Sequence, residues 1–530
     1  MAYVIHNARI HTVDPRQPMA EALAIDGNTI CAVGAEHEIC TAYGIRQAFN
    51  AEGKTIIPGL VDAHIHLETY ALGLQKVNCE TSSRAECLAR VAERARKTPP
   101  GRWILGHGWN QNNWAEGFGN PLDLDEAAGQ HPVYLTAKSL HAGWANSMAL
   151  RLAGINAQSA DPRDGRLGRN PDGSPNGILF EAAMDLMEAA IPEPTAAQVE
   201  QALLVAQQHL LQMGLTGLHD FDRRRCFAAL QQLHQQDKLH LRVTKSIPLE
   251  DLPHAAQLGL RSGFGDDWLR IGSVKGFADG ALGPHTAAMM APFEDDAQNT
   301  GILMLDAEEL FEQGRLAVDS GLSLAIHAIG DRAVHEMLQA FSQLRDYEAA
   351  QSHEGGVRLR HRIEHVQLIH PADQARLGEL GIIASMQPIH ATSDMSMADE
   401  FWGKRAALSY AWRTQLEHGA RLAFGSDAPV ESPNPFWGLH AAVTRRRADG
   451  SPGEEGWYPE QRLQLDEALQ GFTTGPAYAT GMEQRCGRLA IGHLADLLVL
   501  DRDIFQSNPQ EIKDTRPTAT MVGGAWAWQE

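Results

Sequence analysis

The sequence lacks a long apolar run, a paired set of cysteines and an excess of positive charge. No stretch of about 18 consecutive apolar residues occurs among its 530 residues, so we expect no membrane-spanning helix. The first ten residues contain no basic segment followed by an apolar one, so no secretory signal is expected. The formal net charge of −21 argues against binding to nucleic acid or to an anionic membrane surface.

Cysteine is scarce and scattered. No Cys-x-x-Cys pair occurs, and the six cysteines are Cys31, Cys40, Cys79, Cys87, Cys226 and Cys486. In a chain of this length such spacing indicates reduced thiols, so we expect a cytoplasmic protein rather than a disulfide framework. The hydrophobic content of 43% is ordinary for a globular protein. Because the chain is too long for one hydrophobic core, two or three structural units are expected.

Both ends of the chain have the pattern of short β-strands. Residues 1–57 contain apolar runs separated by turn residues such as Asp26-Gly27-Asn28. Residues 483–530 show the same style, with predicted strands at 487–492, 495–501 and 519–526. Because chain termini often lie close together, we expect the two ends to form one β-sandwich domain.

The middle of the chain alternates helices with short apolar strands that end in polar residues. Helical patterns occur, for example, over Thr195–Met213 and Ala307–Ser320. Together with the strand before His64, the predicted strands are 217–220, 241–244, 271–275, 324–327, 362–365, 382–386 and 422–427. Eight such units predict an α/β fold, a (β/α)₈ barrel of the TIM type, built from 58–67 and 191–482. Residues 68–190 are rich in Gly, Asn, Trp and Pro, and we expect an insertion or lid subdomain after strand 1.

The motif Pro58–His66 carries two histidines two residues apart at the end of a strand. Residues i and i+2 of a strand point to the same face, so both imidazoles can reach one point in space. In this barrel the active site lies at the carboxyl ends of the strands. A lone histidine there is more often a hydrogen-bonding residue, but together the strand ends indicate a metal centre. The candidate ligands are His64, His66, Lys275, His327, His365 and Asp427.

These motifs resemble the amidohydrolase superfamily, and more closely its amidohydrolase family 3 (YtcJ-like) branch. The matching segments cover nearly the whole chain: Pro58–His66, His141–Leu150, Asn176–Glu181, Val274–Gly280, Ile326–Asp331, Arg362–His365, Gly425–Pro429 and Gly492–Leu500. The resemblance implies a barrel with a flanking β-sandwich and a centre of one or two divalent metals. It also implies a hydrolase that cleaves a non-peptide C–N bond in an amide, N-acyl or N-formyl compound.

The resemblance further implies a role for each ligand. The two histidines of the first motif would bind the more buried metal together with Asp427, and His327 and His365 would bind a second. Hydroxide and a carboxylated Lys275 would bridge the two metals, because an unmodified ammonium has no lone pair. Zinc suits the histidine-rich set best, although carboxylates also accept Mn or Fe. Asp427 would act as general base and then as general acid when the hydroxide attacks the carbonyl.

Fewer sequence features indicate which residues bind the substrate. The candidate substrate-binding residues are Trp109, Trp114, His141, Asp279 and His390. Two segments depart from the branch: Pro284-His285 replaces a common Ser-Arg pair, and Trp109-Asn110 stands where an acidic residue is often found. Losing an arginine and a carboxylate near a pocket changes which charged substrates are tolerated.

Two other functions remain open from the sequence. A deaminase acting on a ring amidine carbon would use one metal, a free Lys275, and His365 as an electrophile. A binding or regulatory protein on a retained barrel would need no catalysis, and the intact ligand set argues against it. The expected partner is a small amide-type molecule, and the sequence leaves homo-oligomerisation open.

Overall fold

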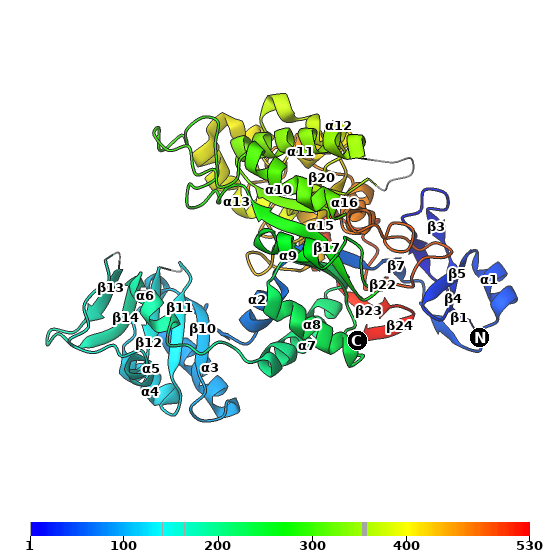
Figure 1. Ribbon diagram of the computed structural model, residues 1–530. Coiled ribbons are helices and arrows are strands. Elements are labelled where there is room, and N and C mark those ends of the chain that lie inside the picture. The colour runs from blue at the N-terminus through cyan, green and yellow to red at the C-terminus, as the bar shows by residue number, and fades with distance from the viewer. Residues whose placement is uncertain (1, 140, 164, 352–357) are drawn as a thin grey trace. The chain divides into compact units, whose positions relative to one another are not determined.

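The computed structural model describes residues 2–139, 141–163, 165–351 and 358–530 (Figure 1). Two compact units are present: Met1–Tyr70 with Leu203–Glu530, and Ala71–Ala202. The second unit corresponds broadly to the predicted insertion of 68–190. Each unit is described separately below.

The first unit contains the predicted barrel. Eight parallel strands lie side by side in chain order: β8 (Leu60–Ile65), β15 (Leu215–Asp220), β16 (Arg242–Pro248), β17 (Leu269–Phe277), β18 (Leu324–Ala328), β19 (Arg362–His365), β20 (Ile383–Met386) and β21 (Leu422–Phe424). Between the first and last strands, Ile65 bridges Ala428 and the Asp427 amide donates to the His64 carbonyl at 2.7 Å. The sheet is therefore a nearly closed barrel, and each of the eight predicted strands overlaps an observed one.

Helices follow these strands, as a parallel sheet requires. They are α7 (Ala196–Gln212), α8 (Arg224–Gln235), α9 (Leu252–Gln257), α10 (Ala307–Asp319), α11 (Asp331–Gln351), α12 (Arg376–Leu380), α13 (Pro388–Trp402), α14 (Trp412–Glu417), α15 (Pro435–Thr444), α16 (Leu465–Gly471) and α17 (Thr474–Ala479). The helix α10 begins with a capping box between Asp306 and Glu309, which satisfies free amide groups of its first turn. The two predicted helices, Thr195–Met213 and Ala307–Ser320, are confirmed as α7 and α10.

Both chain ends contribute to two further sheets. One has the order β5-β4-β1-β6 and the other β24-β23-β22-β7-β2-β3. Their strands are β1 (Tyr3–His6), β2 (Arg9–His11), β3 (Met19–Ala20), β4 (Ala22–Asp26), β5 (Thr29–Gly34), β6 (Ala48–Asn50), β7 (Thr55–Pro58), β22 (Leu497–Leu500), β23 (Pro517–Val522) and β24 (Ala525–Gln529), and α1 (Glu36–Tyr43) follows β5. One buried cluster joins the sheets, with Ile5 and Ile25 from the first and Ile56 and Val499 from the second.

The strand predicted over 487–492 is wrong. This segment is irregular, and Gly487 and Gly492 have φ angles of 83° and 87°. Positive φ values are incompatible with an extended strand and turn the chain instead.

An ion pair connects the barrel to the C-terminal segment. The guanidinium of Arg242 donates to both oxygens of Asp496 at 2.6 and 2.8 Å, and both side chains are 11% exposed. The same carboxylate accepts the Gly523 amide at 2.8 Å. Asp496 therefore holds the start of β16 and the turn between β23 and β24 together.

Replacing Asp496 by alanine should destabilise the first unit. The change leaves a nearly buried guanidinium without its carboxylate, which costs about 3 kcal/mol. We expect the thermal midpoint to fall by several degrees in scanning calorimetry, whereas Glu454→Ala, at an exposed carboxylate, should leave it unchanged. Equal midpoints for the two variants would show that the pair contributes no net stability.

The second unit is built on one six-stranded sheet of order β13-β14-β12-β11-β10-β9. Its elements are β9 (Val77–Asn78), α3 (Arg84–Lys97), β10 (Ile104–Trp109), α4 (Pro121–Ala128), β11 (Val133–Ala137), β12 (Ala142–Ala145), α5 (Ser147–Leu152), β13 (Gly165–Arg169), β14 (Pro175–Glu181) and α6 (Ala183–Glu188). Trp109, Trp114 and Trp144 lie in its core cluster. The chain leaves the barrel through α2 (Leu67–Gly73).

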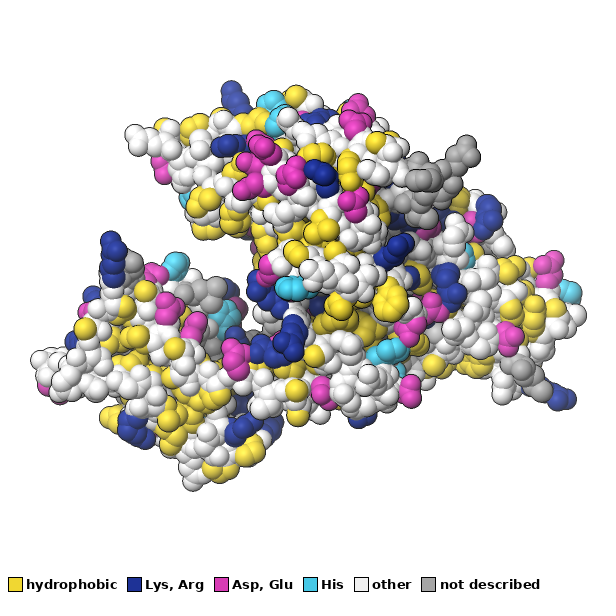
Figure 2. Space-filling view, in the orientation of Figure 1, with side chains coloured by type: hydrophobic (Ala, Val, Ile, Leu, Met, Phe, Trp, Pro, Cys, Tyr) yellow, Lys and Arg dark blue, Asp and Glu magenta, His cyan; other side chains and the backbone are white. Residues whose placement is uncertain are grey.

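None of the described helices is both long and apolar enough to span a bilayer. Acidic, basic and hydrophobic side chains are interspersed on the face that Figure 2 shows.

Candidate metal centre

All six predicted ligands line one pocket of about 350 Å³. They lie at the carboxyl ends of the barrel strands: His64 and His66 at the end of β8, Lys275 on β17, His327 on β18, His365 on β19 and Asp427 just after β21. The barrel therefore brings together residues that are up to 363 positions apart in the sequence, His64 and Asp427 being the outermost pair.

Asp62 sets the position of the first histidine against the last strand. Its Oδ1 accepts the amides of His64 and Ser426, both at 3.0 Å, and its Oδ2 accepts the Ser426 hydroxyl at 2.5 Å. Only glycine fits at position 425, because a Cβ there would lie 2.5 Å from the His64 nitrogen and 2.6 Å from Asp62 Oδ1. This close approach places His64 and Asp427 side by side.

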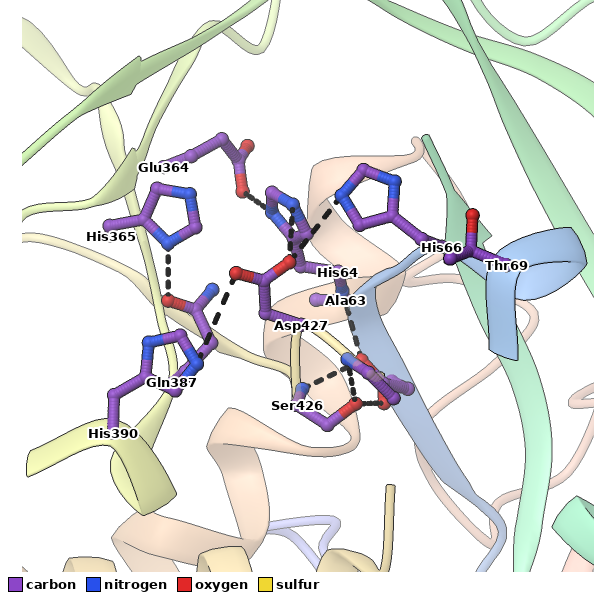
Figure 3. A network of polar contacts seen from close by, with 12 residues as sticks. Ala63, His64, His66, Thr69, Glu364, His365, Gln387, His390, Ser426 and Asp427 are labelled. Carbon is purple, nitrogen blue, oxygen red and sulfur yellow. Dashed lines mark hydrogen bonds and ion pairs between the residues drawn. The ribbon is translucent and has the colours of Figure 1, made fainter. Parts of the chain in front are cut away.

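On β8 the outer ring nitrogen of each histidine meets a carboxylate. The distance from His64 Nδ1 to Glu364 Oε2 is 2.6 Å, and that from His66 Nδ1 to Asp222 Oδ1 is 3.3 Å. Their Nε2 atoms both lie 3.5 Å from Asp427 Oδ1 (Figure 3). Outer carboxylates of this kind orient metal-binding imidazoles and fix their tautomer.

The histidines of β18 and β19 are also held through one ring nitrogen, here by a carbonyl oxygen and an amide oxygen. His327 Nε2 lies 2.8 Å from the Gly280 carbonyl oxygen, and His365 Nδ1 lies 2.8 Å from Gln387 Oε1. Both partners are acceptors, so these nitrogens carry the proton and the other nitrogen of each ring has a free lone pair. The centroids of the two rings are 4.6 Å apart, so the free nitrogens belong to one site.

Ligand-competent atoms form two overlapping groups. Nitrogen and oxygen atoms of His64, His66 and Asp427 lie within 4.8 Å of one another, and so do those of His365, His390 and Asp427. Asp427 belongs to both groups. The arrangement has room for one ion or for two ions that share this carboxylate.

Burial keeps most of these imidazoles neutral, which is the form that binds metal. It lowers the pKa of His64 and His365 well below the usual value and that of His327 to about 3. His66 is less enclosed: burial lowers its pKa, but the hydrogen bond to Asp222 and the charge of Asp427 outweigh this, so its pKa is raised.

Lys275 is buried without a hydrogen-bond partner among the described residues. Its side chain is 5% exposed, and its Nζ lies 5.1 and 4.7 Å from the ring centroids of Phe221 and Phe277. Burial lowers the pKa of this amine to about 8. About a tenth of the amine is therefore neutral at pH 7, far more than for an exposed lysine. This unpaired amine, together with the neutral imidazoles, fits a divalent metal centre.

The sequence analysis missed the residues that hold the ligands. Glu364 is fully buried, pairs with Arg362 and orients His64. Asp222 accepts the amides of Glu68 and Thr69 at 2.5 and 3.1 Å as well as facing His66. One feature of the sequence could have indicated Glu364 and Asp222: both carboxylates lie at or just after the carboxyl end of a barrel strand.

The predicted substrate-binding residues have different surroundings. His390 lines the pocket, and its Nε2 lies 4.0 Å from Asp427 Oδ2. Asp279 is 1% exposed, and its carboxylate accepts the amides of Ala288, Ile329 and Gly330 at 2.8 to 3.0 Å. These bonds hold the segments after β17 and β18, and Asp279 Oδ1 also lies 3.5 Å from His327 Nε2. The structure thus gives Asp279 a positioning role beside a candidate ligand, and a contact with substrate stays a prediction.

The remaining three lie in the second unit. Trp109 and Trp114 are 1% and 4% exposed, and their indole nitrogens donate to the carbonyl oxygens of Leu135 and Thr81. His141 is exposed, and its Nδ1 lies 2.9 Å from Glu181 Oε2. Packing thus accounts for the tryptophans, and a contact of these three with substrate stays a prediction.

The chain matches a family model and several curated proteins over nearly its whole length. The model described as "Amidohydrolase family" matches residues 47–526. Protein LONG AFTER FAR-RED 3 of Arabidopsis thaliana is 32% identical over 98% of this chain and 90% of its own length. The putative amidohydrolase YtcJ of Bacillus subtilis is 29% identical over 100% of both chains. An N-substituted formamide deformylase of Arthrobacter pascens is 30% identical over 99% of this chain and 98% of its own.

Among solved structures, one match is an uncharacterised metal-dependent hydrolase from Pyrococcus furiosus. It is 27% identical, with a TM-score of 0.77 over 95% of this chain and 99% of that chain.

Proposed function

Because this chain belongs to the amidohydrolase family, we propose that it is a metal-dependent hydrolase of a non-peptide C–N bond in an amide, N-acyl or N-formyl compound. The observation that carries the proposal is the set of four imidazoles that line one pocket, each with one ring nitrogen bonded outward. The Nε2 atoms of two of them, His64 and His66, lie 3.5 Å from Asp427 Oδ1. The similarity to a formamide deformylase supports the choice of bond.

In this proposal the candidate ligands form two sets, one for each of two metal ions. His64, His66 and Asp427 would hold one divalent ion, most simply zinc, while His327 and His365 would hold a second. A bound ion would lower the pKa of a coordinated water toward ~7 and polarise the scissile carbonyl. The neutral amine of Lys275 would attack CO₂, lose a proton to solvent and become a carbamate, which supplies two anionic oxygens as ligands.

Asp427 moves the proton. It lies beside both histidines of β8, and burial raises the pKa of its carboxyl group. A raised pKa brings a carboxylate closer to the operating pH, where a general base is most effective. Asp427 takes the proton from the attacking water and delivers it to the nitrogen of the leaving amine.

Metal removal tests the proposal. We expect purified protein to contain tightly bound divalent metal and to hydrolyse at least one member of a panel of formamides and N-acyl amines. Chelation should abolish the activity, and Zn²⁺ or Mn²⁺ should restore it. The same protein grown with ¹³C-bicarbonate should show a carbamate carbon signal that Lys275→Ala lacks.

Three outcomes would change the proposed function or one of its residue roles. Ammonia release from a ring amidine, with one metal per chain and no carbamate signal, would indicate the deaminase. Absence of bound metal, together with no hydrolysis after adding Zn²⁺ or Mn²⁺, would indicate a binding protein. Bound metal without the carbamate signal, but with amide hydrolysis, would remove only the role given to Lys275.

A further inference from the structure

Beyond the candidate ligands, the pocket is lined by two kinds of side chain. Apolar groups come from β17, from the segments after β17 and β18, and from the segment after β21; they include Phe277, Leu282, Ile329 and Val430. Acidic groups come from α13 and from the segment after β21, as Asp394 and Glu431. The lining therefore offers apolar surface and carboxylates in addition to the candidate ligands.

The surroundings of the two acidic groups contain no cationic partner among the described residues. Asp394 Oδ2 accepts the Tyr410 hydroxyl at 2.5 Å, which fixes the orientation of the carboxylate. Among the described residues, no lysine or arginine lies within ion-pair distance of Asp394 or Glu431. Lys275 is the one cationic side chain of the described lining, and it belongs to the candidate metal centre. A ligand with a second carboxylate would find no cation in this lining other than Lys275.

His390 connects the acidic part of the pocket to the reaction centre. It lies on α13 four residues before Asp394, so the two side chains share one face of the helix. The side chain is 6% exposed, and its Nε2 has no hydrogen-bond partner among the described residues. Because this atom lies 4.0 Å from Asp427 Oδ2, it is a buried polar group beside the position of the reacting amide.

We propose that the substrate is a small amide or formamide whose far end carries a protonated amine. The amide lies beside Asp427, the aliphatic part against Phe277 and Ile329, and the ammonium near Asp394 and Glu431. A volume of about 350 Å³ is at the lower end for ligand pockets, so the spacer between amide and amine is short. This inference rests on the proposed hydrolase function.

Kinetics with three matched substrates test the charge preference. The substrates are N-(5-aminopentyl)formamide, N-pentylformamide and 6-formamidohexanoate, which differ mainly in the charge of the far end. We expect kcat/KM to fall in that order, with the cationic substrate preferred over the neutral one by about tenfold or more. In Glu431→Gln and in Asp394→Asn the cationic-to-neutral ratio should fall by about tenfold, while Glu455→Gln, at an exposed carboxylate outside the pocket, should keep it.

A binding measurement makes the test independent of turnover. Calorimetric titration of the purified metal-containing protein with 5-aminopentan-1-ol and with pentan-1-ol compares an ammonium with a methyl group at the far end. We expect the amino alcohol to bind about tenfold more tightly, and the difference to shrink in Glu431→Gln and to weaken at high salt.

The results separate this inference from the function on which it rests. Hydrolysis of all three formamides with equal kcat/KM, or equal affinity for the two titrants, would overturn the charge preference and leave the hydrolase intact. A preference for the amino alcohol without hydrolysis of any amide would support the acidic pocket and overturn the proposed reaction.

Discussion

Replacing His64 by alanine should abolish both metal binding and hydrolysis, with a loss in kcat/KM of about 10⁴-fold or more. The side chain is 1% exposed, and its Nε2 lies 3.5 Å from Asp427 Oδ1. Alanine supplies no donor atom and also leaves Glu364 without its imidazole partner. Elemental analysis of metal content and steady-state kinetics on the best substrate of the panel would measure the two losses.

The control for this variant is a histidine outside the site. His254 is exposed on α9, so His254→Ala should keep metal content and activity at the level of the unchanged protein. Circular dichroism of His64→Ala would verify that the barrel still forms. If His64→Ala retained metal at full stoichiometry, the ligand assignment would be wrong.

Replacing Asp427 by asparagine should lower kcat by about 10²- to 10⁴-fold while leaving much of the metal in place. Asparagine keeps an oxygen ligand but cannot accept and return the proton. The φ angle of Asp427 is 59°, a left-handed conformation that asparagine tolerates far better than most residues. The substitution therefore changes the chemistry with little backbone strain.

For this variant we would measure kcat, KM and metal content together. Asp346→Asn, at an exposed position on α11, is the matched control and should match the unchanged protein in all three. An unchanged kcat in Asp427→Asn would contradict its role in proton transfer. Complete loss of metal would show instead that the carboxylate acts chiefly as a ligand.

The barrel and the gathering of the candidate ligands in one pocket could be predicted from the sequence because each depends on local pattern. Short apolar runs that end in histidine, lysine or aspartate mark both a strand and its carboxyl end. In a parallel barrel all such ends meet at one face. Residues as distant as His64 and Asp427 could thus be assigned to one pocket without any knowledge of their contacts.

The outer partners of the ligands could not be predicted in the same way. The contact of Glu364 with His64 depends on the register between strands at opposite sides of the barrel, and that of Asp222 with His66 depends on the path of the chain after β15. Neither is encoded by spacing along the chain. Asp279 shows the converse problem: its position near a strand end suggested a pocket residue, whereas backbone amides surround its carboxylate.

Composition alone did not settle the role of two segments. The tryptophan-rich run around Trp109 suggested a substrate surface, but large aromatic side chains are equally suited to a small core. Trp109 and Trp114 lie in the core of the second unit, and their contact with substrate stays a prediction. The apolar residues of 487–492 suggested a strand, but the glycines at both ends have positive φ values.

The junction between β8 and β21 makes metal affinity and barrel closure parts of one equilibrium. No continuous ladder joins these strands among the described residues. They are connected by one bridge, by the backbone bonds from Asp427 to His64 and from His66 to Ala428, and by the bonds around Asp62. The histidines of β8 and Asp427 stand on opposite sides of this junction, so an ion bound by all three links its edges. By mass action, each tenfold rise in free metal above its dissociation constant adds about 1.4 kcal/mol against opening at this junction. Amide hydrogen exchange in β8 should therefore slow in step with metal occupancy, while exchange in β22 and β23 should not.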